Sequence, residues 1–150
     1  MNLKDILKRK GYVKINLKKI NTNHFEVKAF INNVKGRFIL DTGASNSCVA
    51  MNLAEKFELS LEDSNTKAAG AGAIGMDTMV SSSNEIKLGQ WNFKNFNLVL
   101  LDLSHVNTAL TEHDADAVDG IIGADILEKG KAIIDYKNKC LFLKKLVYKY

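Results

Sequence analysis

The chain has 150 residues, 46% of them hydrophobic, which is enough for one compact core but short for two domains. No apolar run approaches the length of a membrane-spanning helix, and residues 1–10 lack the apolar core of a secretion signal, so no membrane partner is expected. The net charge of +4 combines two basic ends with an acidic middle: residues 1–19 and 129–150 each carry seven basic side chains and one acidic one.

These basic ends have two interpretations. They could attract nucleic acid or an anionic membrane, or they could be edge strands on which lysine discourages unwanted strand pairing. Lysine alternates with apolar residues at both ends, and no aromatic and basic stacking surface is evident. The second interpretation is favoured, so no nucleic-acid partner is expected.

The predicted elements are mostly strands. In chain order, alternating or continuous apolar residues predict strands at 13–17, 25–29 and 34–40, a helix at 53–59, and a hairpin over 86–98 that turns at Gly89 and Gln90. A short helix over 124–128, stopped by Gly130, precedes the last strands at 131–136 and 140–143. The pattern predicts a single all-β domain over 1–150, a closed barrel or sandwich with one or two short helices.

The most informative segment ends the third of these strands. The apolar run 38–40 gives way abruptly to Asp41-Thr42-Gly43 and then to small residues. Gly43 allows the chain to turn, and the Thr42 hydroxyl can bond to a neighbouring backbone group. Such a turn presents a carboxylate at the mouth of a cleft, although Asp-x-Gly alone also occurs in ordinary turns.

A second segment supplies context for the first. Residues 118–123 form another apolar pair that ends in glycine, Ile121-Ile122-Gly123, and a short helical signal follows. With Asp41-Thr42-Gly43, this order resembles the aspartic proteases of the retroviral type over about residues 24–144. The resemblance implies that Asp41, Thr42 and Gly43 are the catalytic residues. It also implies that Ile121, Ile122 and Gly123 form the strand that supports the active-site loop.

A glycine-rich segment lies between the two motifs. Its glycines match the dinucleotide-binding pattern G-x-G-x-x-G, but polar residues precede it and a strand signal follows it, so the helix that would hold a pyrophosphate is missing. The resemblance implies instead a flap that folds over the substrate. The predicted substrate-binding residues are Ala44, Gly70, Ala71, Gly72, Ala73, Ile74 and Gly75.

Other chemically active residues fit simpler roles. The acids Asp114, Asp116 and Asp119 loosely resemble a calcium loop, with Asp125 at its twelfth position, but the glycine is misplaced, so a solvated loop is favoured. The three histidines are too scattered for metal-ligand spacing and are expected to be ordinary surface or hairpin residues: His24, His105 and His113. No metal or cofactor is expected.

The two cysteines, Cys48 and Cys140, are too few for a disulfide framework. Cys48 is expected to pack beneath the active-site loop, and Cys140 is expected in the core. Two buried thiols favour a reducing cytoplasm as the location.

The chain carries one Asp-Thr-Gly where the chemistry needs two aspartates, so the resemblance implies a homodimer that cleaves peptides with a water activated between two Asp41 carboxylates. Thr42 would then lock the two loops together. Two positions depart from related enzymes. Retroviral enzymes commonly have an arginine, which stabilises their dimer, where this chain has Ala124. Pepsin-like enzymes often have a serine where this chain has Ala44, and the absence of that hydroxyl predicts a mildly acidic to neutral pH optimum. The alternative is a silent protease-fold module that binds peptides without cutting them.

Overall fold

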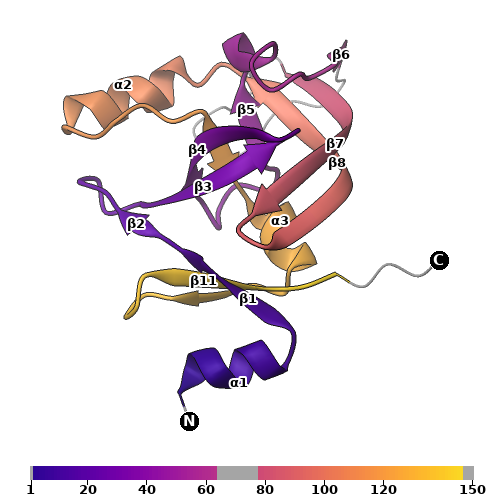
Figure 1. Ribbon diagram of the computed structural model, residues 1–150. Coiled ribbons are helices and arrows are strands. Elements are labelled where there is room, and N and C mark those ends of the chain that lie inside the picture. Colours follow the sequence, from indigo (N-terminus) through magenta and orange to yellow (C-terminus); the bar gives the residue numbers. More distant parts are fainter. Residues whose placement is uncertain (1, 64–77, 147–150) are drawn as a thin grey trace.

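The computed structural model describes residues 2–63 and 78–146, which form an all-β body with three α-helices and one 3-10 helix (Figure 1). The elements are α1 (Leu3–Arg9), β1 (Tyr12–Asn16), β2 (Lys18–Lys19), β3 (Phe25–Ile31), β4 (Val34–Leu40), β5 (Cys48–Ala50), η1 (Met51–Leu53), β6 (Glu62–Asp63), β7 (Met79–Leu88), β8 (Trp91–Leu101), α2 (Ser104–Glu112), β9 (Gly120–Ile122), α3 (Ala124–Lys129), β10 (Ile133–Asp135) and β11 (Cys140–Lys144).

The larger sheet closes on itself. Its strand order is β2-β3-β4-β9-β5-β8-β7-β6, and an additional pairing of β3 with β7 joins the two sides, which leaves a six-stranded closed barrel. Alternate residues of β3 point into the barrel, as in Val27, Ala29 and Ile31, and the tight β3–β4 turn uses Asn32 and Asn33 at φ 51° and 67°. The predicted all-β closed fold is therefore confirmed.

One glycine permits a close backbone approach in this barrel. Gly120 begins β9, which pairs in parallel with β4 and antiparallel with β5. A Cβ at Gly120 would lie 2.1 Å from the carbonyl oxygen of Cys48 on β5. Any larger residue would push these two strands apart, so glycine is needed where β9 is inserted between β4 and β5.

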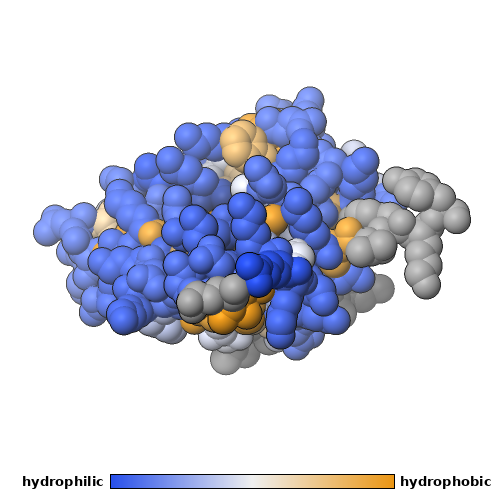
Figure 2. All heavy atoms as spheres, turned by 60° about the horizontal axis from the view of Figure 1, so that its bottom comes forward, coloured by the Kyte–Doolittle hydropathy of each residue, from blue (hydrophilic) through white to orange (hydrophobic). Residues whose placement is uncertain are grey.

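A second, three-stranded sheet in the order β1-β11-β10 lies below the barrel with α1 (Figure 1). The last two predicted strands are present as β10 and β11, which pair antiparallel as a hairpin. Figure 2 shows the lower face as mostly hydrophilic with a small hydrophobic patch; α1 lies on this side, and its Leu3 and Ile6 are 43% and 39% exposed. None of the described helices is long and apolar enough to cross a membrane.

Three helical regions differ from the predictions. The helix predicted at 53–59 is wrong: η1 ends at Leu53, turns follow, and Glu58 has φ 55°, which a right-handed helix cannot accommodate. The buried ring of Phe57, 6.2 Å from that of Phe38, fixes this segment by packing. The basic segment 1–20, predicted as a strand or extension, begins with helix α1, capped by the Asn2 side chain. Helix α2 was not predicted.

Candidate active site

The loop from Asp41 to Ser47, called here the site loop, joins β4 to β5. β9 fixes its beginning, because the parallel register pairs Leu40 with Ile122, and the N–H of Asp41 then donates to the carbonyl oxygen of Ile122 at 2.9 Å. Ile121 and Ile122 are both buried. The strand predicted to support the loop thus holds its first residue directly.

The carboxylate of Asp41 is held by the turn that follows it. The N–H of Gly43 donates to Asp41 Oδ1 at 2.9 Å, and the N–H of Ala44 donates to the Asp41 carbonyl oxygen at 3.2 Å. A Cβ at Gly43 would lie 3.3 Å from the same Oδ1, closer than ordinary contact. Asp41 itself is half-buried, while Thr42 and Gly43 are exposed. One carboxylate oxygen is therefore oriented, and the group remains accessible.

A buried polar network holds the far end of the site loop. Ser47, which is 0% exposed, donates through Oγ to Asp125 Oδ1 at 2.7 Å and through its N–H to Asp125 Oδ2 at 2.9 Å. The N–H of Gly123 donates to Ser47 Oγ at 2.8 Å, and the N–H of Ala124 donates to the Ala44 carbonyl oxygen at 2.7 Å. The Ser47 hydroxyl both donates and accepts a hydrogen bond, so it joins the start of α3 firmly to the loop.

Sequence reasoning missed this network. The sequence places Asp125 only at a position of a calcium-like loop and predicts no role for Ser47. The two residues are 78 positions apart, and no motif connects them. The sequence does contain one indication of this role: Asp125 lies in the first turn of the helix that follows Gly123, next to Ala124. In this chain Asp125 is the charged group that ties the start of α3 to the loop.

Cys48 lies under the site loop with its thiol protonated. Burial raises the pKa of the Cys48 thiol to about 12; a hydrogen bond from the Ile121 backbone opposes this, and the charges of Asp125 and Asp41 add to it. Cys48 packs with Ala44, Ile39 and Ile121 in one apolar cluster. A thiol that is protonated at neutral pH is a poor nucleophile, so its contribution here is packing.

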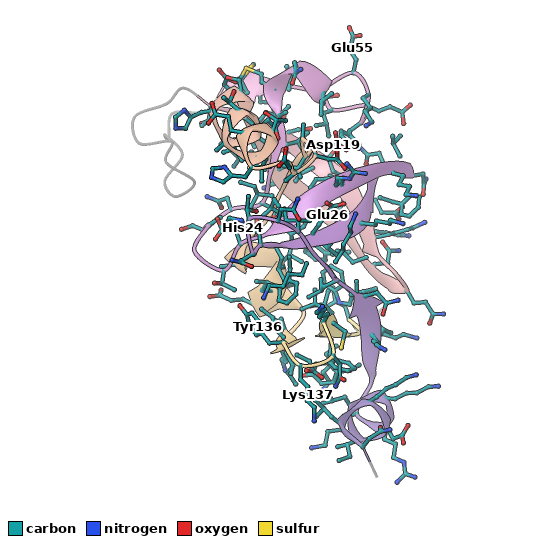
Figure 3. The ribbon with its side chains drawn as sticks, turned by 90° about the vertical axis from the view of Figure 1, so that its left-hand side faces the viewer. His24, Glu26, Glu55, Asp119, Tyr136 and Lys137 are labelled. Atoms are coloured by element: carbon teal, nitrogen blue, oxygen red, sulfur yellow. The ribbon has the colours of Figure 1, made fainter. Side chains whose placement is uncertain are left out.

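A pocket of about 640 Å³ opens beside Asp41. Its floor is apolar and comes from Ile39 and Ile121 of the barrel, with Val106 and Leu110 of α2. The remaining lining, called here the pocket wall, consists of residues 21–24, which precede β3, and the exposed face of α2. In Figure 3, which faces this side of the molecule, His24 lies below α2. Among the described lining residues, Asp41 is the only carboxylate.

Helix α2 is anchored to the barrel by one asparagine. Asn107 donates from Nδ2 to the carbonyl oxygen of Val118 at 3.1 Å and accepts at Oδ1 from the N–H of Val118 at 2.8 Å. Leu110, 4% exposed, packs beneath the helix. Only Val106 and Leu110 give α2 an apolar side, which is why its periodicity was too weak to predict a helix.

The predicted substrate-binding residues are only partly described. Gly70, Ala71, Gly72, Ala73, Ile74 and Gly75 lie outside the described residues. Ala44 is 4% exposed and packs under the site loop rather than in the pocket lining, so its side chain faces the core. The histidines, expected to be separate surface residues, are exposed but all three line this pocket: His24, His105 and His113.

The sequence profile of the aspartyl protease family matches residues 27–126, which include the site loop, β9 and the start of α3. The chain belongs to the aspartyl protease family. No curated protein sequence is significantly similar to it.

Solved structures share the retropepsin-like fold of this family member. A retropepsin-like aspartic protease from Rickettsia conorii is 24% identical with a TM-score of 0.58, and the match covers 90% of this chain and 91% of that one. The retroviral protease-like domain of Ddi1 from Leishmania major is 20% identical with a TM-score of 0.54, covering 81% and 88%. The EIAV protease in complex with the inhibitor HBY-793 is 19% identical with a TM-score of 0.53, covering 82% and 91%.

Proposed function

We propose that this protein is an aspartic endopeptidase that hydrolyses peptide bonds of extended or unfolded polypeptides. The observation that carries the proposal is the placement of Asp41: its carboxylate is oriented by the Gly43 N–H at 2.9 Å and lies in the lining of a pocket of about 640 Å³. A surface aspartate would need neither the glycine turn nor the buried network behind it.

The active unit in this proposal is a homodimer. Each chain provides one Asp41, and a two-fold axis would bring two such carboxylates together. Two carboxylates in contact cannot both ionise cheaply, so they share one proton, as is known for aspartic proteases. Thr42, exposed next to Asp41, would be the group that locks the two site loops together.

The chemistry then divides between the two carboxylates. The ionised Asp41 takes a proton from a water molecule as the water oxygen attacks the peptide carbonyl carbon. The protonated Asp41 donates a hydrogen bond to the carbonyl oxygen, where negative charge develops. The Asp41 that took the proton from water then gives a proton to the leaving amine nitrogen as the carbon–nitrogen bond breaks. Ser47 and Asp125 take no part in these transfers; they keep the site loop in place.

We place this activity in the cytoplasm. Both cysteines are free and buried, which suits a reducing compartment. Because Ala44 supplies no hydroxyl to the catalytic carboxylates, we expect an optimum between mildly acidic and neutral pH, and an optimum below about pH 3.5 would contradict that expectation.

The test is cleavage of a mixture of unfolded peptides from pH 3 to pH 8 by the wild type and by Asp41→Asn. We expect cuts by the wild type, and a rate at least about a thousandfold lower in the variant, because both proton transfers are lost. Asp114→Asn is the matched control, since Asp114 is exposed outside the pocket and its φ of 60° suits asparagine. It should retain full activity.

Sedimentation at the assay concentration accompanies this test. If a stable dimer makes no cuts, the endopeptidase proposal is wrong and a peptide-binding module replaces it. Cuts that persist in Asp41→Asn would show that another group performs the chemistry.

A further inference from the structure

The chain has three histidines, and all three line the pocket beside Asp41. His24 comes from the segment before β3, while His105 and His113 lie at the two ends of α2. Residues about 80 positions apart thus bring three imidazoles to one cavity. The mechanism proposed above uses none of them.

The histidines form the sides of the pocket above its apolar floor. His105, Ala109 and His113 follow one another at four-residue spacing, so they lie along one face of α2 and its C-terminal cap. Val106 and Leu110, one position further on, contribute to the floor. His24 stands on the other segment of the wall, below α2 in Figure 3.

The rings of His113 and His24 each form a hydrogen bond through Nδ1 to a residue close by in the sequence. His113 Nδ1 lies 2.9 Å from the carbonyl oxygen of Ala109, and because a carbonyl only accepts, this nitrogen donates. His24 Nδ1 lies 2.8 Å from Thr22 Oγ1. Within the described residues no hydrogen bond is made by the Nε2 atoms or by the ring of His105. The Nε2 atoms remain for a ligand.

The three histidines are the only basic side chains in the described lining of the pocket. The described lining contains no lysine or arginine, and its one carboxylate is Asp41. The acids nearest in sequence to the two histidines of α2 are exposed and outside the lining: Asp102, Glu112 and Asp114. Among the described residues, no three histidine, cysteine, aspartate or glutamate side chains form a group that could hold a metal ion.

We propose that this pocket selects substrates with an acidic side chain, glutamate above all, and that His24, His105 and His113 determine the selection. The methylenes of the side chain lie on the apolar floor, and its carboxylate accepts charge-assisted hydrogen bonds from the imidazolium rings of the wall. This inference rests on the proposed function, because it concerns the same site.

The selection depends on pH in a defined direction. Histidine is generally protonated below about pH 6.5, and glutamate is ionised above about pH 4.3. Attraction is therefore greatest between these values. Raising the pH above this range should weaken the preference for glutamate over glutamine.

The experiment uses peptides that differ only in one residue near the cleaved bond, glutamate, glutamine or lysine, with each flanking position tested in turn. For the wild type we expect one position at which kcat/KM favours glutamate over glutamine about tenfold at pH 5.5 and about twofold or less at pH 7.5. Lysine at that position should be the poorest. In His24→Asn/His105→Asn/His113→Asn, the ratio should be close to one at both pH values.

His105→Asn alone is the second variant, because its ring makes no hydrogen bond within the described residues and its loss should not disturb folding. It should lower the glutamate preference by about two- to threefold. Lys35→Gln, which removes an exposed cation outside the pocket lining, is the matched control and should change nothing. A wild type without glutamate preference, or a preference retained by the triple variant, would overturn the inference.

A binding measurement separates this inference from the proposed function. Fluorescence anisotropy of the same labelled peptides with Asp41→Asn at pH 5.5 requires no cleavage. Tighter binding of the glutamate peptide, lost when the three histidines are also replaced, would support the pocket even if the wild type proves inactive. Equal binding of the two peptides, or no binding of either, would count against it.

Discussion

The site loop and the pocket wall lie side by side around Asp41, but the hydrogen bonds of Ser47 that hold the loop are buried or part-buried, whereas those of the histidine side chains in the wall are exposed. The bonds that hold the loop cross long stretches of sequence: Gly123 to Ser47 and Ser47 to Asp125 span 76 and 78 positions, and Ser47 is fully buried. The bonds of the histidine side chains span two and four positions and are exposed. The backbone that carries Asp41 is thus fixed by buried contacts, whereas the selectivity proposed above rests on exposed side chains.

The largest expected effect is the removal of the hydroxyl at the centre of the loop network. Ser47→Ala leaves the buried Gly123 N–H without its acceptor and deprives Asp125 of one donor. We expect the free energy of unfolding to fall by about 3 kcal/mol and Tm to fall by about 10 °C. Thermal unfolding followed by circular dichroism measures both. Ser45→Ala, an exposed neighbour in the same loop, is the control and should change Tm little.

A hydroxyl can also be removed from the pocket wall, and the loss of stability can be compared with that of Ser47→Ala. Thr22→Ala removes one exposed hydrogen bond, to His24, and should change the free energy of unfolding by less than about 0.5 kcal/mol. If Thr22→Ala proved as costly as Ser47→Ala, the division between a fixed loop and a replaceable wall would be wrong.

A smaller effect concerns Cys48 and alkaline pH. Because the folded-state pKa of Cys48 is raised from 9.0 to about 12, the folded protein binds this proton more tightly than the unfolded chain does. The associated stability is complete below pH 9 and is lost as pH rises toward 12. We therefore expect Tm to fall more steeply between pH 9 and pH 11 in the wild type than in Cys48→Ala. Parallel slopes would show that Cys48 does not contribute.

The sequence predicted those parts of the molecule whose structure is set locally. Asp41-Thr42-Gly43 specifies its own turn, since the Gly43 N–H reaches a carboxylate two residues away. The β3–β4 hairpin likewise needs only alternating residues and two asparagines able to adopt positive φ. The closed barrel followed from such short strands and from the family resemblance.

What the sequence did not predict depends on contacts between distant segments. Nothing local indicates that Ser47 meets Asp125, or that His24 faces the same pocket as His105. Helix α2 has few apolar residues, and its position is fixed by Asn107 and Val118 rather than by its own periodicity. Phe57 is held in a turn by packing, although its segment resembled a helix.

The central claim is that two copies of Asp41 act together, and mixing the wild type with Asp41→Asn tests it most directly. The two proteins are unfolded and refolded together at equal amounts, and the cleavage rate is compared with that of the wild type alone at the same total concentration. If both carboxylates are needed, only dimers of two wild-type chains are active, and about one quarter of the rate remains. Retention of half the rate would show that each chain works independently and would contradict the shared site.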